Sequence, residues 1–176
     1  MITAAEVIAL LGLEPLPEEG GLFRRTYCAA ESLPAVALPG RYRGPKPFGS
    51  AIYYLLTADP DSFSALHRLP TDEIYHFYLG APVEMLLLYP EGRSERTVLG
   101  PDLRNGQRVQ RVVPAGTWQG ARLVADGDFA LLGATMAPAF TPEDYVGGDR
   151  ELLSAQYPAE AALIRLLTRL RASGEA

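Results

Sequence analysis

Residues 66–80 read Leu-His-Arg-Leu-Pro-Thr-Asp-Glu-Ile-Tyr-His-Phe-Tyr-Leu-Gly, and this stretch contains both histidines of the chain. A Pro-Thr-Asp turn follows His67 and leads into a run rich in aromatic and β-branched residues, which is typical of a strand. Asp72 and Glu73 lie between the two histidines, so imidazoles and carboxylates surround the start of this strand. These groups bind metals or transfer protons near neutral pH. The stretch therefore predicts a strand and a candidate site together.

Short segments of strand-like sequence continue on both sides of this stretch. Turn signals such as Asp59-Pro60, Glu91-Gly92 and Asn105-Gly106 separate them at intervals of about ten residues. No helix-length segment interrupts the series, which argues against parallel βαβ winding. We therefore predict an all-β antiparallel sandwich or barrel. The predicted strands are residues 22–29, 51–57, 62–68, 74–79, 83–89, 95–99, 107–113, 117–124 and 129–136.

Helical patterns are confined to the two ends of the chain. Thr3 and Glu6 form a capping box for a short helix over residues 3–11, and Gly12 can end it. Thr141-Pro-Glu-Asp has the acidic character of a helix start, and residues 158–171 carry a leucine stripe. We predict one domain over residues 1–176, divided into an N-terminal helix and turn (1–20), a β-barrel (21–137) and a C-terminal helical segment (138–176). The loop at 32–47 has four prolines and two glycines, and it is either mobile or a cover.

The composition excludes several classes of function. The net charge is −5, and no block of Lys and Arg occurs, so we expect no nucleic-acid partner. No apolar run approaches the roughly 18 residues of a membrane span, so we expect no membrane partner. Cys28 is the one cysteine of the chain and cannot form an internal disulfide, which favours the cytoplasm. We interpret Cys28 as a small buried or half-buried hydrophobic residue.

Two parts of the sequence resemble the motifs of the cupin superfamily. His67, Glu73 and Gly80 fit the first cupin motif, although Leu69 occupies the place of its second histidine. Pro114 and Gly116 fit the second motif, although a glutamine, Gln119, stands where a metal-binding histidine is usual.

The chain is most similar to a cupin branch described only as a domain of unknown function. The resemblance extends from about Ile8 to Tyr145, with Leu16 and Ala65 as departures. It implies a jelly-roll barrel, usually a homodimer, related to sugar-nucleotide epimerases but without a settled activity. Together with the helical patterns at the two ends, it leads us to predict an all-β jelly-roll barrel with a short N-terminal helix and a C-terminal helix. The segments that carry it are 18–21, 23–27, 51–56, 72–80 and 113–119.

Strand alternation divides the side chains after the turn between two faces. Glu73, Tyr75 and Phe77 share one face, whereas His76 lies on the other. If Glu73 points into the barrel, as the resemblance implies, Tyr75 and Phe77 line the cavity or pack in the core. We interpret His76 as a hydrogen-bonded residue between sheets or at a dimer contact, outside the site.

His67 and Glu73 are the candidate catalytic residues, since a histidine beside a carboxylate forms an acid/base pair. Gln119 joins them from another strand. Transition metals normally take three or four imidazole or carboxylate ligands, and an amide is a poor substitute. We therefore expect no cofactor; if a divalent transition metal binds, its ligands are His67, Glu73 and Gln119.

The remaining candidates concern ligand binding. Arg24 is a counter-charge for an anion. Tyr53 or Tyr54 can also contribute, because strand parity lets one of the two face inward, and we assign Tyr53. Trp118 points to the face opposite Gln119. The candidate ligand-binding residues are Arg24, Tyr53, Tyr75, Phe77 and Gln119.

Three functions remain open at this stage. The first is the binding of a small anionic or sugar-like metabolite inside the barrel, without catalysis. The second is an epimerase-like or isomerase-like enzyme that uses His67 and Glu73 for acid/base chemistry. The third is a metal-dependent enzyme. We also expect a homodimer, since small jelly rolls have sheet edges that need covering.

Overall fold

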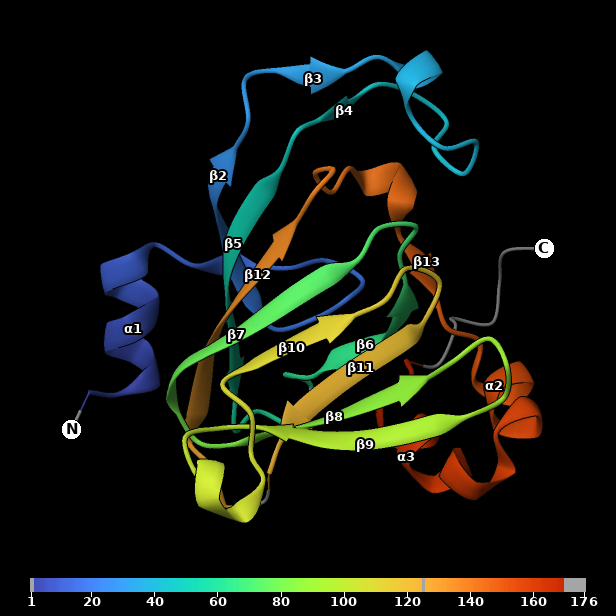
Figure 1. Cartoon of the computed structure of the whole chain (residues 1–176). Helices are drawn as coiled ribbons and strands as arrows, with labels where there is room; N and C mark the ends of the chain where they lie inside the picture. Colours follow the sequence, from blue (N-terminus) through green and yellow to red (C-terminus); the bar gives the residue numbers. More distant parts are fainter. Residues whose placement is uncertain (1, 125, 170–176) are drawn as a thin grey trace, which may run out of the picture.

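Two antiparallel sheets packed face to face form the body of the protein (Figure 1). The computed structural model describes residues 2–124 and 126–169. One sheet has six strands in the order β1-β2-β5-β12-β7-β10, namely Glu14–Pro15, Leu22–Cys28, Ser50–Thr57, Phe129–Met136, Glu73–Gly80 and Gln110–Val113. The other has five in the order β13-β6-β11-β8-β9, namely Val146–Gly147, Ser64–Arg68, Trp118–Leu123, Val83–Leu88 and Ser94–Leu99.

The strand pairing is that of a jelly roll. β5 pairs with β12, β6 with β11, β7 with β10 and β8 with β9, each antiparallel. The pairs are nested, so the segment from β5 to β12 is one long hairpin wrapped into a barrel. The predicted all-β antiparallel class is confirmed. β10 begins three residues later than predicted, because the 3₁₀ turn Leu103–Asn105 (η2) ends at Gly106 in a left-handed conformation.

The main core lies between the two sheets. Tyr54, Tyr75, Met85, Leu87 and Leu132 are among its buried members. β8 is apolar on both faces, since Leu86 and Leu88 point away from this core into a second cluster under the C-terminal helices. Burial on both faces explains why residues 85–88 of this strand, after the partly buried Glu84, read as a continuous apolar run instead of alternating.

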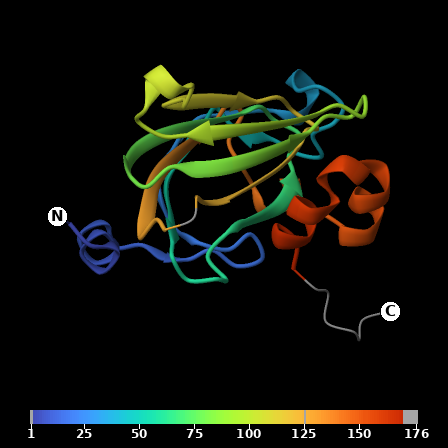
Figure 2. The same ribbon diagram turned by 90° about the horizontal axis from the view of Figure 1, so that it is seen from below.

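Helix α1, Ala4–Leu11, covers part of the outer face of the six-stranded sheet. Its predicted capping box between Thr3 and Glu6 is present, and Gly12 ends it with φ 59°. The C-terminal helices cover the outer face of the five-stranded sheet on the other side of the molecule (Figure 2). None of the helices within the described ranges is long and apolar enough to cross a membrane.

The C-terminal segment differs from the prediction. In place of one helix over residues 158–171, there are α2 (Arg150–Gln156), a 3₁₀ turn η4 (Pro158–Glu160) and α3 (Ala161–Leu166); residues 170–171 lie outside the described residues. The predicted helix start at Thr141 is one 3₁₀ turn, η3 (Pro142–Asp144), since Tyr145 is extended and leads into β13. Asp149 caps α2 by accepting from the amides of Glu151 and Leu152.

The proline-rich loop forms an arm beyond the end of the barrel (Figure 1). β3 (Ser32–Leu33) and β4 (Lys46–Pro47) pair at its base, and a 3₁₀ turn, η1 (Ala35–Ala37), lies between them.

Cys28 is exposed at the end of β2, so the interpretation as a buried or half-buried residue is wrong. The strand extends here beyond the area that α1 covers.

Candidate functional site

His67, Glu73 and Gln119 meet inside the barrel, as predicted. His67 on β6 and Gln119 on β11 are register partners and are each 1% exposed, whereas Glu73 reaches them from β7 in the facing sheet. Gln119 Nε2 donates to Glu73 Oε2 at 2.7 Å and lies 3.4 Å from His67 Nε2. One amide group therefore bridges the carboxyl and the imidazole. We call these three residues the barrel triad.

The backbone fixes the proton on the imidazole. His67 Nδ1 lies 2.8 Å from the carbonyl oxygen of Ala65. A carbonyl can only accept, so Nδ1 carries the proton and Nε2 presents its lone pair to the Gln119 amide.

Glu73 has a strongly altered acidity. Burial raises the pKa of its carboxyl from 4.5 to about 7, because the charged form loses its hydration. The imidazole of His67 acts in the opposite direction, the Glu19 carboxylate raises the pKa further, and the hydrogen bond from Gln119 lowers it. A group with this pKa can both hold and release a proton near neutrality.

Several residues that the sequence analysis did not select surround the barrel triad. The ring of Tyr145 stacks on His67, with centroids 5.2 Å apart and planes at 20°. Tyr54 OH donates to the carbonyl oxygen of Gly20 at 3.0 Å, and Ser64 Oγ donates to Glu19 Oε1 at 2.9 Å. The Glu18-Glu19-Gly20-Gly21 segment was noted as part of the resemblance, but its role was not. Tyr145 carried no recognisable signal in the sequence.

The other predicted residues lie in different places. Tyr75 is buried between the sheets, and Phe77 packs against the same core. Tyr53 lies on the outer face, where its ring meets Tyr78 edge to face; Tyr54 is the tyrosine of this pair that faces inward. Arg24 is exposed and donates from Nη1 to the carbonyl oxygen of Leu11 at 2.9 Å. Tyr53 and Arg24 are therefore not part of the group around His67.

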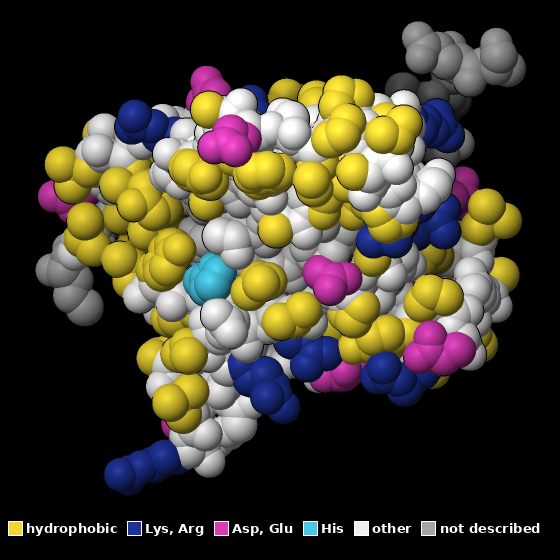
Figure 3. All heavy atoms as spheres, turned by 45° about the horizontal axis from the view of Figure 1, so that its top comes forward, with side chains coloured by type: hydrophobic (Ala, Val, Ile, Leu, Met, Phe, Trp, Pro, Cys, Tyr) yellow, Lys and Arg dark blue, Asp and Glu magenta, His cyan; other side chains and the backbone are white. Residues whose placement is uncertain are grey.

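His76 lies on the outer face, as strand alternation predicted. Its Nε2 is 3.2 Å from Thr135 Oγ1, and its Nδ1 is 3.3 Å from Gln110 Nε2. His76 is half-buried on this face. Figure 3 shows one histidine at the surface, with hydrophobic side chains next to it. Trp118 also points outward, under the C-terminal helices, where Arg68 stacks on it.

The barrel triad does not suit a transition metal. The Gln119 amide nitrogen, which carries hydrogens, points at Glu73 Oε2 and lies next to His67 Nε2, where a metal would have to bind. Two ligands of good quality remain, fewer than a stable site needs. Across residues 2–124 and 126–169, no group of three or more His, Cys, Asp or Glu side chains is placed to hold a metal ion.

One polar atom of the barrel triad is left without a partner. Gln119 Oε1 is buried, and no hydrogen bond satisfies it in the part of the chain that the structure describes. Buried polar atoms are nearly always hydrogen-bonded, so this exception leaves an acceptor that a donor from a ligand or a water molecule would satisfy.

A cavity of about 750 Å³ opens beside Tyr145, at the end of the barrel where β6 ends and β7 begins. Its walls include Arg41, Arg43, Arg68, Glu143 and Tyr145. Since Tyr145 stacks on His67, one aromatic ring separates this cavity from the barrel triad.

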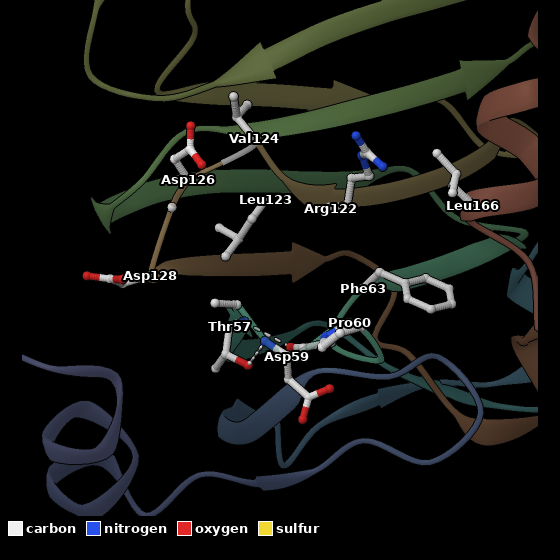
Figure 4. Close-up of a pocket in the computed structure, with 13 residues that line it drawn as sticks. Thr57, Asp59, Pro60, Phe63, Arg122, Leu123, Val124, Asp126, Asp128 and Leu166 are labelled. Atoms are coloured by element: carbon white, nitrogen blue, oxygen red, sulfur yellow. Dashed lines mark hydrogen bonds between the residues drawn. The ribbon is translucent and has the colours of Figure 1, made fainter.

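A second cavity, of about 470 Å³, lies at the opposite end and contains none of the predicted residues. Asp59, Asp126 and Asp128 line it, but their carboxylates point in different directions (Figure 4). Because they do not converge, they do not form a cation site.

The nested antiparallel strands and the polar cluster between them define a jelly-roll barrel with an internal site. The chain belongs to the family described as "Cupin superfamily (DUF985)", whose model matches residues 5–146. The resemblance deduced from the sequence is thereby confirmed.

Relatives of the chain occur in distant organisms. An uncharacterized protein of Saccharomyces cerevisiae is 31% identical over 121 residues, which are 66% of this chain and 59% of the yeast protein. The match thus spans less than two thirds of that curated relative. An X-ray structure of a Shewanella oneidensis protein is 33% identical with a TM-score of 0.83, covering 97% of this chain and 100% of that one. A hypothetical protein from Leishmania major is 26% identical with a TM-score of 0.84, covering 96% and 100%.

Proposed function

We propose that this protein binds a small anionic or sugar-like metabolite at the barrel triad. The observation that carries the proposal is the unpartnered Gln119 Oε1, a buried acceptor next to a carboxyl and an imidazole. A ligand hydroxyl supplies the donor that this oxygen lacks. Tyr145 adds an aromatic wall beside His67, as is common in pockets for rings and sugars.

The two histidines provide a matched test. We expect His67→Ala to weaken binding of the natural ligand, because it removes the Nε2 acceptor and the surface on which Tyr145 stacks. His76→Ala is the control, since this histidine lies on the outer face. Native mass spectrometry of the freshly purified protein detects a co-purified ligand and its loss. Equal ligand occupancy in the two variants would contradict the proposal.

The same samples test the metal. We expect the purified protein to be mostly metal-free, because the Gln119 amide takes the place of an imidazole. We also expect His67→Ala to weaken ligand binding without any loss of metal. Elemental analysis that gives close to one transition-metal ion per chain, removed by His67→Ala, would overturn this expectation and support metal-dependent chemistry.

A second candidate function is an isomerase or epimerase. It is favoured by the pairing of His67, whose Nδ1 faces the Ala65 carbonyl oxygen, with Glu73, whose pKa burial raises to about 7. His67 Nε2 would take the proton from a carbon next to a carbonyl, and protonated Glu73 would supply one on return. Arg24 does not assist in this scheme, because its guanidinium binds Leu11 outside the barrel.

Isotope exchange distinguishes catalysis from binding alone. A panel of keto acids and sugars is incubated with the protein in D₂O, and deuterium at the carbon next to the carbonyl is followed by NMR. Enzyme-dependent exchange that His67→Ala abolishes and His76→Ala preserves would establish the acid/base function. Exchange that both variants retain would exclude His67 as the base.

A further inference from the structure

The cavity beside Tyr145 gathers positive charge on an acidic protein. The loop at 32–47 contributes Arg41 and Arg43, and the end of β6 contributes Arg68. None of the three guanidiniums forms an ion pair with a carboxylate of the described residues, in contrast to Arg96 and Arg111, which do. The chain as a whole has a net charge of −5, so this local reversal of sign requires an explanation.

The acidic side chains of the cavity do not cancel this charge. Asp144 also lines the cavity, but its carboxylate is neutralised by Lys46 at 2.6 Å. Glu143 is the remaining acid among the lining residues. The lining residues thus include three arginines against one free carboxylate, a formal charge of +2, and the guanidinium of Arg68 also stacks on Trp118.

The loop that carries two of these arginines is held firmly. Lys46 is 1% exposed, and its Nζ donates to both carboxylate oxygens of Asp144 and to Thr141 Oγ1. Tyr42 OH lies 2.7 Å from Thr71 Oγ1, and both residues are buried. Arg41 Nε donates to the carbonyl oxygen of Pro70 at 2.7 Å, which orients the guanidinium while its two amino groups remain available.

These anchors join the arginines to the barrel site. Asp144 directly precedes Tyr145, so the Lys46–Asp144 pair fixes the loop against the segment whose tyrosine stacks on His67. In Figure 1 the arm lies above the orange segment between β12 and β13, which contains η3. The arm, the arginines and Tyr145 therefore form one wall at the mouth of the barrel.

We propose that Arg41, Arg43 and Arg68 bind the anionic group of the ligand, a phosphate or a carboxylate, at the mouth of the barrel. The forked guanidinium matches both groups through paired hydrogen bonds. The remaining polar part of the ligand then extends past Tyr145 toward the barrel triad, and this part of the inference rests on the proposed function. The arginine cavity replaces Arg24 as the anion site and gives the loop at 32–47 a role.

The test uses two simple anions as probes, inorganic phosphate and succinate, in NMR titrations of the full chain. We expect saturable chemical-shift changes of arginine side-chain Nε–H signals. The tighter binding of the two probes, phosphate or succinate, indicates whether the natural ligand carries a phosphate or a carboxylate. Arg43→Gln and Arg68→Gln should each weaken binding about tenfold, the value of one charge-assisted hydrogen bond pair. Arg104→Gln, an exposed arginine in η2, should leave binding unchanged.

Other outcomes overturn the inference separately from the proposed function. If neither anion gives saturable shifts, or if Arg104→Gln weakens binding as much as Arg43→Gln, the arginine site is rejected. His67→Ala should retain anion binding, since the arginines do not depend on it. If native mass spectrometry shows ligand loss in His67→Ala but full occupancy in Arg43→Gln and Arg68→Gln, the proposed function stands and this inference fails. Melting temperatures confirm folding, and exposed Arg43 and Arg68 should tolerate replacement.

Discussion

Glu73 is the residue whose chemistry differs most from that of the free amino acid. Burial raises the pKa of its carboxyl from 4.5 to about 7. Between pH 4.5 and about pH 7, Glu73 keeps a proton in the folded protein that it has released in the unfolded chain. The free energy of unfolding therefore falls as the pH rises through this range. The pKa difference of roughly 2.5 corresponds to about 3 kcal/mol.

A neutral replacement isolates this effect. We expect Glu73→Gln to resemble the natural protein in stability at about pH 4.5 and to exceed it by about 3 kcal/mol at pH 8. Urea denaturation at several pH values measures the free energy of unfolding of both proteins. Parallel curves across this range would show that Glu73 titrates at its ordinary value.

Gln119 is the residue that separates this site from a metal centre. Its amide nitrogen lies 2.7 Å from Glu73 Oε2 and 3.4 Å from His67 Nε2. We expect Gln119→His to create a three-ligand site for Co²⁺ or Zn²⁺, because an imidazole then faces an imidazole and a carboxylate. Cobalt absorption bands during titration report binding. Equal cobalt affinity in the natural protein would contradict our account of the amide.

The sequence could predict the barrel triad but not its whole surroundings. Alternation along one strand placed Glu73 and Tyr75 on the same face, because a strand has a fixed period of two, and the resemblance implied that this face points into the barrel. The same rule could not choose between Tyr53 and Tyr54, because the strands that pair with β5 decide which of its two faces points inward. Arg24 was assigned to ligand binding from its charge alone. The hydrogen bond that it donates to the carbonyl oxygen of Leu11 is a tertiary contact, which the sequence does not reveal.

At the scale of elements, the buried Lys46–Asp144 ion pair connects the arm, through β4, to the turn η3. Lys46→Ala leaves a buried carboxylate without its counter-charge, which should cost about 3–5 kcal/mol. Lys46→Met combined with Asp144→Leu should recover most of this loss, because no unpaired charge remains. Denaturation of the two variants measures both effects. A double variant as unstable as Lys46→Ala would show that the pair itself, and not the orphaned charge, determines stability.

Element boundaries were predicted well where the chain itself carries the signal. The capping box of Thr3 and Glu6 is a local contact and is observed. The C-terminal segment was predicted less well. The leucine stripe masked a break at Pro158, where η4 separates α2 from α3. Asp149 was a usable cap signal for α2, but a flanking Gly-Gly pair made the segment resemble a loop.

At the scale of the whole molecule, the jelly-roll order came from the resemblance and not from strand patterns. Periodicity identifies strands, but β5 and β12 pair across more than seventy residues, and no local feature encodes that choice. The sequence also could not predict which residues on the outer face of the six-stranded sheet are exposed, because their exposure depends on how much of this face α1 covers.

This outer face leads to the last prediction, that the protein is a homodimer. Beyond α1, a row of register partners crosses the sheet from Tyr27 through Thr135 and Ile74 to Val112. Tyr27, Tyr78 and Val112 are 57%, 49% and 47% exposed, so large apolar side chains face solvent together with His76. A second copy of the chain that packs on this face buries these groups.

Sedimentation at micromolar concentration tests this prediction. We expect twice the chain mass of 19.1 kDa, and we expect Tyr78→Arg combined with Val112→Glu to give the single-chain mass, because each copy then introduces charge into the apolar contact. Leu152→Glu is the matched control, since Leu152 is a 71% exposed apolar residue on α2, on the other side of the molecule. A 19.1 kDa species alone for the natural chain would reject the dimer. A dimer that survives the double substitution would place the contact elsewhere.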